Sequence, residues 1–415
     1  MANKPKIRFK GFDDAWEQRK LLSCIQSITD FRGRTPKKLG MDWSESGYLA
    51  LSALNVKDGY IDFSQDVHYG NQELYDKWMS GKELHRGQVL FTTEAPMGNV
   101  AQVPDNKGYI LSQRTIAFDV EEKILSENFL ATLLRTPNVF NDLIALSSGG
   151  TAKGVSQKSL SGLDVVIPKN IDEQNKLADY FINLDNLITL HQRKCDQMKE
   201  LKKYMLTKMF PQNGAKVPEI RFDGFIDDWE QRKLDDWGTF YYGKSCPKWS
   251  VTEDSTTPCI RYGELYTKFG AKIDRVYSYT NMSPENLRFS KGTEVLIPRV
   301  GEDPMDYNHC TWLSMPNVAI GEMISVFNTD NNPLFTAMMF NATLQNEFAM
   351  RVEGGSVTNL YFEKLKSIEV SFPSIPEQEK IAAYFDSIDH LITLHQSKCE
   401  NLKNLKEYLL RNMFV

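Results

Sequence analysis

Residues 171–210 of the chain read IDEQNKLADYFINLDNLITLHQRKCDQMKELKKYMLTKMF, and residues 375–414 read IPEQEKIAAYFDSIDHLITLHQSKCENLKNLKEYLLRNMF. The two stretches align without a gap and are identical at more than half of their positions. A shorter repeat precedes each of them, KIRFKGFDDAWEQRKL at residues 6–21 and EIRFDGFIDDWEQRKL at residues 219–234. The chain therefore carries one layout twice: a short lead segment, a variable block and a long repeat.

Each long repeat is predicted to form a single helix. In the first copy no proline or glycine occurs between Glu173 and Pro211, and apolar residues recur at intervals of three and four. Such a seam, kept up for about five heptads, is typical of a two-helix coiled coil, and we expect the two seams to pack against each other. Lys202 and Lys406 interrupt the seam at matching positions. The residues expected to pack between the helices are Leu177, Phe181, Leu184, Ile188 and His191 in the first and Ile381, Phe385, Ile388, Ile392 and His395 in the second.

The two variable blocks share little sequence but have the same general character. Short β-branched and aromatic runs, such as QVLFTT at residues 88–93 and MISVF at residues 323–327, alternate with turn residues and a few helical stretches. Each block closes with a Gly-Gly loop, at residues 149–150 and 354–355, followed by an apolar strand that ends in proline. We predict an α+β fold for each block, with one scaffold carrying two different sets of loops.

The repeats divide the chain into four parts. A chain of 415 residues is too long for one ordinary core, and two domains with connecting helices account for its length. The predicted parts are a first domain with its lead segment at 1–170, a central helix at 171–212, a second domain with its lead segment at 213–374, and a C-terminal helix at 375–415.

Composition and charge bear on the class of protein. Apolar residues make up 41% of the chain, as in ordinary folded proteins, and no apolar run reaches the roughly 20 residues that span a membrane. The six cysteines are scattered without a C-x-x-C pair, which fits reduced thiols and a cytoplasmic location. The net charge of −5 argues mildly against nucleic acid, and residues 211–374 alone carry 16 basic against 22 acidic residues. DNA binding would therefore depend on local basic loops and on a partner.

Motifs for catalysis, cofactors or metals are weak. The stretch GGTAKGVSQKS at residues 149–159 lacks the frame of a phosphate-binding P-loop. Asn332-Pro333-Leu334-Phe335 lacks the second proline of an amino-methyltransferase loop, so a plain turn is preferred. The pairs His191/Cys195 and His395/Cys399 each lie on one helix face, but an antiparallel arrangement would separate the two cysteines too far for one tetrahedral ion. We predict no catalytic residues, no metal and no cofactor.

Basic and amide side chains gather in loops of both blocks. The stretch FRGRTPKK at residues 31–38 places an arginine–lysine cluster around a turn, where it could contact phosphates or guanine. The stretch Ser112-Gln113-Arg114 adds amide and guanidinium groups suited to base edges. The glycine-rich loops at 149–157 and 354–359 offer backbone N–H groups to phosphate oxygens. Each of these segments could equally be an ordinary solvated loop. The candidate DNA contacts are Arg32, Arg34, Lys37, Lys38, Asn55, Lys57, Gln113, Arg114, Thr151 and Lys153 in the first block and Lys244, Lys248, Arg261, Lys268, Arg299, Asn308, Ser356, Thr358 and Asn359 in the second.

The lead motif R-F-x-G-F-x-x-x-W-E-Q-R-K-L, the Gly-Gly-Thr and Gly-Gly-Ser loops, and E-Q-x-K opening a long helix that ends in Met-Phe together resemble the specificity subunit of type I restriction–modification systems. The resemblance implies two target-recognition domains related by pseudo-twofold symmetry and separated by two long antiparallel helices forming a coiled coil. Each domain would read one half of a bipartite, asymmetric DNA site. The chain itself would be non-catalytic.

The resemblance also implies partners. These are double-stranded DNA, two methyltransferase subunits and, in the restricting complex, motor-nuclease subunits, with no membrane association. AdoMet, ATP and Mg²⁺ would belong to those subunits, and the two long helices would form part of the methyltransferase docking surface.

Three alternatives remain open from the sequence. The chain could be a coiled-coil scaffold or assembly protein whose domains bind other proteins, which the acidic second block favours slightly. It could be a nuclease with an unfamiliar site. It could also serve a fused methyltransferase–nuclease in place of separate subunits.

Overall fold

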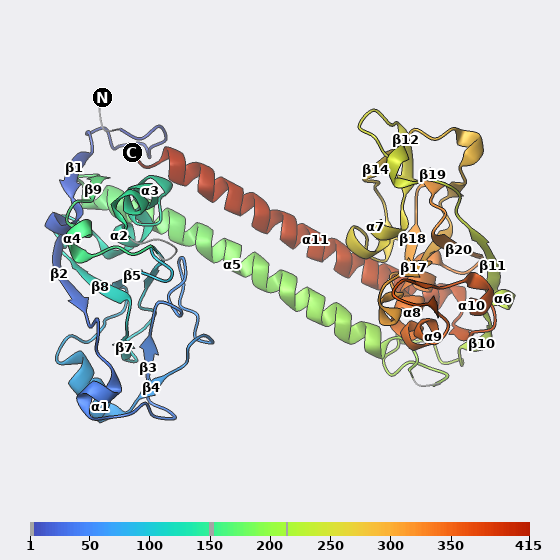
Figure 1. Cartoon of the computed structure of the whole chain (residues 1–415), viewed down its shortest axis with the longest axis horizontal. Coiled ribbons are helices and arrows are strands. Elements are labelled where there is room, and N and C mark those ends of the chain that lie inside the picture. The colour runs from blue at the N-terminus through green and yellow to red at the C-terminus, as the bar shows by residue number, and fades with distance from the viewer. Residues whose placement is uncertain (1–3, 149–152, 213–214) are drawn as a thin grey trace. The chain divides into compact units, whose positions relative to one another are not determined.

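The computed structural model describes residues 4–148, 153–212 and 215–415 (Figure 1). The chain forms two compact units: unit 1 consists of Met1–Arg193 with Gln396–Val415, and unit 2 of Lys194–His395. This division differs from the predicted one, because each long helix is shared between the two units instead of forming a part of its own. The helices are α5 (Ile171–Lys208) and α11 (Ile375–Asn412).

Unit 1 is built on two small sheets. The first is antiparallel with the strand order β2-β8-β5-β6, and the second has the order β4-β3-β7, in which β3 and β7 run parallel. A separate pair, β1 and β9, joins the lead segment to the strand before α5. The strands are β1 (Glu17–Lys20), β2 (Ile25–Asp30), β3 (Tyr48–Leu51), β4 (Tyr69–Gly70), β5 (Val89–Thr92), β6 (Val100–Gln102), β7 (Tyr109–Leu111), β8 (Thr115–Val120) and β9 (Asp164–Ile167).

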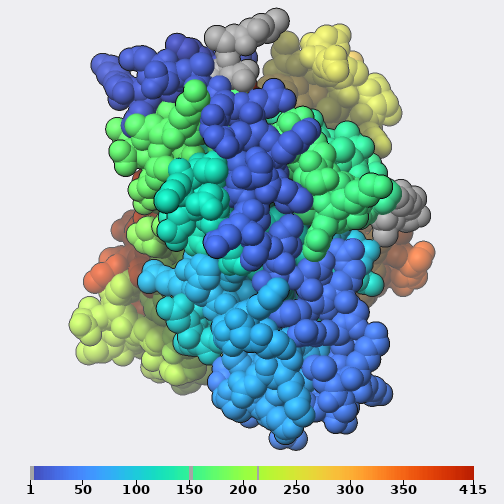
Figure 2. Space-filling model, turned by 90° about the vertical axis from the view of Figure 1, so that its left-hand side faces the viewer, coloured from blue at the N-terminus to red at the C-terminus, as the bar shows by residue number. Residues whose placement is uncertain are grey.

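Strands β5 and β8 of the first sheet of unit 1 are buried on both faces, which explains their apolar runs, whereas the edge strand β2 is partly exposed. In β5, Val89 and Phe91 face a core that includes Phe129, whereas Leu90 between them faces the second sheet. Figure 2 shows the lead segment and the first strands, in dark blue, running between green segments that come much later in the chain. The short helices of unit 1 are α1 (Gln72–Met79), α2 (Glu127–Leu133), α3 (Pro137–Leu146) and α4 (Gln157–Leu160).

Unit 2 repeats this topology despite its different sequence. Its first sheet has the order β11-β20-β16-β18-β13 and its second β14-β12-β19-β15, and β12 and β19 run parallel as β3 and β7 do. A third, three-stranded sheet has the order β17-β22-β21, and β10 pairs with β23 as β1 pairs with β9. The strands are β10 (Glu230–Lys233), β11 (Gly238–Tyr242), β12 (Thr257–Ile260), β13 (Lys272–Ile273), β14 (Ser278–Thr280), β15 (Phe289–Lys291), β16 (Glu294–Pro298), β17 (Val300–Gly301), β18 (Thr311–Leu313), β19 (Pro316–Ile320), β20 (Ile324–Thr329), β21 (Glu353–Gly354), β22 (Thr358–Asn359) and β23 (Glu369–Phe372).

The helices of unit 2 are also short apart from its shares of α5 and α11. One of them explains the Asn332-Pro333 pair, because Asn332 caps α8 by accepting a hydrogen bond from the backbone N–H of Phe335, and Pro333 occupies the first turn. The sequence predicted a plain turn at Asn332–Phe335, and the structure shows that these residues begin a helix. The helices are α6 (Leu234–Trp237), α7 (Tyr262–Thr267), α8 (Pro333–Thr343), α9 (Gln345–Ala349) and α10 (Phe362–Leu365).

Within each unit, α5 and α11 pack together in opposite directions, which confirms the predicted antiparallel pair. In unit 1, Lys406 Nζ lies 2.5 Å from Asp185 Oδ1, and Cys399 Sγ lies 3.9 Å from the carbonyl oxygen of Ile188. In unit 2 the equivalent pair joins Lys202 Nζ to Asp389 Oδ1 at 2.6 Å. The lysines that interrupt the seam are therefore neutralised by aspartates of the facing helix.

The predicted seam residues lie on the packed side of the helices. Leu177, Phe181 and Leu184 belong to the core of unit 1, and Ile381, Phe385 and Ile388 belong to that of unit 2. The predicted seam residues nearer the middle of the helices, Ile188, His191, Ile392 and His395, are half-buried. No helix among the described residues has an apolar stretch that could cross a bilayer.

The end of each long helix completes the core of the unit it enters. In unit 1, the ring of Phe414 lies 6.1 Å from Trp16, 5.8 Å from Phe129 and 5.7 Å from Phe181. Phe210 occupies the same position in unit 2, where its ring lies 5.4 Å from that of Phe335. Because each core needs the Met-Phe end of the other repeat's helix, the helices are divided between the units.

We expect Phe414→Ala to lower the free energy of unfolding of the chain by about 3–5 kcal/mol, because it leaves a cavity among three aromatic rings. Val415→Ala is the matched control, since Val415 is 38% exposed and should change stability little. Urea denaturation followed by circular dichroism measures both variants. A loss below about 1 kcal/mol for Phe414→Ala would contradict the proposed role of the helix end.

Candidate nucleic-acid interface

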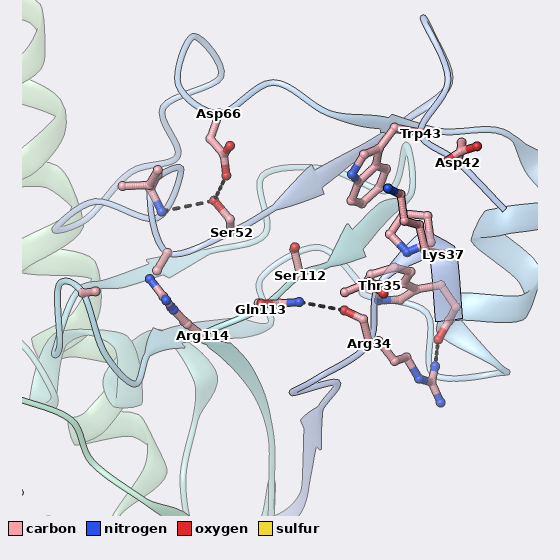
Figure 3. A pocket seen from close by; sticks show the side chains of 15 residues that line it. Arg34, Thr35, Lys37, Asp42, Trp43, Ser52, Asp66, Ser112, Gln113 and Arg114 are labelled. Atoms are coloured by element: carbon pink, nitrogen blue, oxygen red, sulfur yellow. Dashed lines mark hydrogen bonds between the residues drawn. The ribbon is translucent and has the colours of Figure 1, made fainter. Parts of the chain in front are cut away.

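A pocket of about 440 Å³ lies in unit 1 where several strands end (Figure 3). Because β3 and β7 are parallel, their C-terminal ends share one edge, and the turns Ser52–Leu54 and Ser112–Arg114 lie beside each other there. Strand β2 ends at the start of β8, which brings the loop with Arg34–Lys37 to the same edge. The topology thus gathers three loops from distant parts of the sequence.

The pocket unites four of the predicted DNA contacts, which come from two loops about 80 residues apart: Arg34, Lys37, Gln113 and Arg114. Gln113 Nε2 donates a hydrogen bond to the carbonyl oxygen of Arg34 at 2.9 Å, as Figure 3 shows. The Arg34 guanidinium lies 4.2 Å from the centre of the Phe31 ring and donates to the Trp78 carbonyl. Arg34 is thereby held in place, while Gln113 and Arg114 are exposed.

The other walls of the pocket are aromatic and acidic. Trp43 stacks on His68, with ring centres 5.3 Å apart and planes 18° apart, and lies next to the buried Trp78. Across the pocket, Ser52 Oγ donates to Asp66 Oδ2 at 2.6 Å. An apolar wall flanked by cationic donors and carboxylate acceptors can contact base edges, thymine methyl groups and phosphates.

Backbone strain is concentrated at this pocket. Asp66, Ala95 and Arg114 all have positive φ, at 44°, 47° and 65°, and all three line the pocket. Residues other than glycine rarely adopt this conformation, and they persist mainly at functional sites where the surroundings hold them. This signal supports the pocket as a functional site and was not accessible from the sequence.

One predicted contact in this region is corrected by the structure. Asn55 is fully buried. Its side-chain oxygen accepts hydrogen bonds from the backbone N–H and hydroxyl of Ser52, and its amide donates to the carbonyl groups of Asp62 and Gln65. The side chain therefore shapes the loop at residues 52–66 and cannot reach a base edge.

The remaining candidates of unit 1 lie around the pocket or away from it. Arg32 is exposed and pairs with Asp30 at 3.5 Å, and Lys38 Nζ donates to the Gly33 carbonyl at 2.8 Å. Lys153 is exposed and Lys57 is partly so. Thr151, with the Gly-Gly pair before it, lies outside the described residues.

In unit 2 the equivalent strand ends carry different side chains. Arg261 follows β12, Gly321 and Glu322 follow β19, and Lys244 follows β11. The loops touch, since the backbone N–H of Glu322 donates to Ser245 and that of Lys244 to Ile320. Ser245 has a positive φ of 63°, and so does the following Cys246 at 64°. Unit 2 thus also strains its backbone at this edge.

Arg299 joins this cluster. Its guanidinium lies 4.7 Å from the centre of the Tyr242 ring and 5.3 Å from that of Tyr361, and Nη1 donates to the Glu322 carbonyl at 3.4 Å. Burial, together with a hydrogen bond to Glu363, raises the pKa of Tyr242 to about 12, so this phenol stays protonated. Stacked guanidinium groups with fixed positions are suited to phosphate or base recognition.

The sequence did not single out two residues that extend the cluster. Arg288 lies 5.0 Å from the Tyr241 ring centre and donates to the Tyr242 carbonyl at 2.6 Å. Trp249 is 71% exposed, next to the predicted and exposed Lys248.

The other candidates of unit 2 lie outside this cluster. Thr358 is a further correction: it is 5% exposed, and its hydroxyl donates to the Gly301 carbonyl and bonds Tyr307 Oη, so it holds the β17–β22 sheet together. Asn308 donates to the Asn341 carbonyl at 3.3 Å. The three that remain are Lys268 and Ser356, which are exposed, and Asn359, which is half-buried.

All six cysteines are free and buried. Burial raises the pKa of the Cys310 and Cys24 thiols, whereas a hydrogen bond with Cys259 lowers the pKa of Cys246. Among the described residues no group of three or more His, Cys, Asp or Glu is placed to hold a metal ion.

Comparisons with known proteins agree with this architecture. The family described as "Type I restriction modification DNA specificity domain" matches residues 14–200 and 226–404, one match for each repeat. Two proteins of Methanocaldococcus jannaschii are similar over nearly their whole length: the type I restriction enzyme MjaVIII specificity subunit, at 21% identity over 95% of this chain and 91% of the relative, and the putative MjaX specificity subunit, at 22% identity over 98% and 95%.

Solved structures show the same fold. The type I S subunit from M. genitalium superposes with a TM-score of 0.63 at 15% identity, covering 99% of both chains. A chain from a structural study of complex assembly and conformational transition in the type I restriction–modification system gives a TM-score of 0.52 at 17% identity over 97% of this chain and 98% of that one. With the family matching both repeats, this chain belongs to the type I restriction–modification DNA specificity family.

Proposed function

We propose that each unit reads one half of a bipartite, asymmetric DNA site on behalf of partner subunits. The observation that carries this proposal is that equivalent strand ends of two matching scaffolds bear unlike side chains. After β7, unit 1 presents Gln113 and Arg114, whereas after β19 unit 2 presents Gly321 and Glu322. Glutamine suits adenine, arginine suits guanine and glutamate can accept from cytosine, so the two units would select different sequences.

We expect Gln113→Ala to relax the DNA specificity of one half of the site only. Losing one good base contact lowers discrimination by about 1–3 kcal/mol, or roughly 5- to 150-fold, at the affected position. The measurement is methylation of duplexes with single-base changes, by the chain assembled with its methyltransferase, and mapping of modified adenines gives the motif. Lys107→Ala is the control, because Lys107 is highly exposed and lies outside the pocket.

If Gln113→Ala relaxed the specificity for both halves of the DNA site equally, the two units would not be reading the halves separately. A continuous or palindromic motif for the unaltered chain would count against the bipartite site. Absence of any sequence-dependent binding by the assembled complex would favour the scaffold alternative.

The long helices supply a surface for a partner. In unit 1, Leu187 and Leu190 of α5 are each 44% exposed, and Leu405 and Tyr408 of α11 are 42% and 57% exposed. The same four positions recur in unit 2 as Leu391, Leu394, Leu201 and Tyr204. Exposed apolar side chains that recur in both repeats indicate two equivalent docking surfaces, and we propose that each binds one methyltransferase subunit.

We expect the double variant Leu187→Gln and Leu190→Gln to weaken one of the two methyltransferase sites by about tenfold or more, because it removes apolar contacts without breaking the helix. Native mass spectrometry should then show one methyltransferase per chain at concentrations that give two for the unaltered chain. Thr189→Ala, exposed on another face of the same turn, should keep two. Unchanged stoichiometry in the double variant would place the partner elsewhere.

We also propose that the chain is non-catalytic and acts in the cytoplasm. AdoMet, ATP and Mg²⁺ would be used by the methyltransferase and by motor-nuclease subunits, or by a fused enzyme that combines both activities. The purified chain should therefore neither methylate nor cleave DNA with these cofactors, and adding the methyltransferase should confer methylation. Metal-dependent cleavage by the chain alone would support the nuclease alternative.

A further inference from the structure

The loop at residues 52–66 connects the pocket of unit 1 to the long helices. At one end of this loop, Ser52, Leu54 and Asp66 line the pocket. At the other end, a small turn is closed by the bridge between Val56 and Ile61 and carries Asp58 at its tip. The buried Asn55 connects the two ends, because its side chain bonds to Ser52 on one side and to the carbonyl oxygen of Asp62 on the other.

Arg135, which lies between α2 and α3, ties this loop to the helix pair. Its Nε donates to Asp58 Oδ1 at 2.5 Å, and its Nη1 donates to Asp185 Oδ2 of α5 at 2.8 Å. The other oxygen of Asp185 accepts from Lys406 Nζ of α11 at 2.5 Å. One continuous chain of charges therefore runs from the loop through the arginine to both helices.

The geometry of this link is specific to an arginine. The Arg135 side chain is 13% exposed and that of Lys406 is 15% exposed, so water screens the inner part of the network little. The planar guanidinium can hold two carboxylates in fixed directions, which an ammonium group cannot do. Gly59 has φ +87°, and a Cβ there would lie 2.6 Å from Arg135 Nη2, so a larger residue would strain the loop and displace the guanidinium.

Unit 2 has a weaker form of the same link. Lys272 of β13, in the segment after β12, lies 3.2 Å from Asp386 of α11, and both side chains are substantially exposed, at 31% and 48%. Asp389, the equivalent of Asp185, pairs with Lys202. Both units thus tie the segment after the equivalent strand to the long helices, and in unit 1 the tie runs through a mostly buried arginine that is shared by two carboxylates.

We propose that Arg135 is a positioning residue for DNA recognition, which holds the reading loop at residues 52–66 in a fixed place relative to the helices that bind the methyltransferase. This inference rests on the proposed function. Arg135 would touch neither DNA nor partner. Arg135 would keep the pocket wall in a fixed position relative to the helices. The DNA half-site read by unit 1 would then be recognised and also placed correctly for methylation.

The test is Asp58→Asn in the full chain assembled with its methyltransferase. Asp58 is 66% exposed on its side chain, so the change removes one charge from the link without emptying the core. We expect discrimination against single-base changes, measured as the ratio of kcat/KM for methylation, to fall by roughly 2- to 30-fold in the half assigned to unit 1. Discrimination in the other half and binding of the methyltransferase should not change.

Two further variants sharpen the result. Asp58→Glu keeps the charge and should restore much of the discrimination, whereas Arg135→Lys keeps the charge but loses the planar contact and should fall between the two. Glu73→Gln is the matched control, since Glu73 forms an exposed pair with Lys77 on α1 that has no link to the helices.

Equal loss in both halves would show a general loss of stability and would overturn the proposal, as would full discrimination in Asp58→Asn. Failure of the proposed function would give another result, because the unaltered complex would then show no preference for a bipartite DNA site.

Discussion

The rest of the structure depends on an ion pair between a buried glutamate at the start of each long helix and an arginine of the lead segment. Glu173 is 2% exposed and accepts hydrogen bonds from Nε and Nη2 of Arg8 at 2.7 and 2.8 Å. Glu377 is 1% exposed and receives the same two bonds from Arg221 at 2.6 and 2.7 Å. A buried carboxylate is tolerated only when it is paired, and the first turn of a helix is its favoured position.

This pair fixes the lead segment across the start of the helix, and the core follows from it. Trp16 donates from Nε1 to Glu173 at 3.2 Å, which sets its ring where Phe414 arrives from the other helix. In unit 2, Trp229 also lies beside Phe210, with ring centres 6.3 Å apart, although its Nε1 is buried without a hydrogen-bond partner. Lead segment, helix start and helix end are therefore one structural joint that occurs once in each unit, which explains why these segments are the ones that repeat in sequence.

Those repeated segments could be predicted in detail, and the α+β character of both domains in outline. Periodicity identified both helices, and their matching lysines marked positions that the structure explains by Asp185 and Asp389. The sharing of each helix between units could not be predicted, because it depends on which core the Met-Phe ends enter. For the site, charge and loop position identified Arg34 and Gln113 separately, but only the pairing of the end of β2 with the start of β8 shows that they meet. Asn55 was wrongly predicted to contact DNA. An amide side chain in a polar loop looks the same in sequence whether it faces solvent or hydrogen-bonds to the backbone of its own loop.

The candidate site shows how a chain with a net negative charge can still recognise DNA. Affinity from phosphate contacts is independent of sequence and grows with the number of neutralised charges, so a strongly basic reader would bind any DNA. Here the cations are few and held in place: Arg34 by the Trp78 carbonyl, and Arg299 between two tyrosines. A chain of net charge −5 with such fixed cations would gain little from non-specific DNA, so binding at this site would depend on base contacts. Selectivity would then come at the expense of affinity.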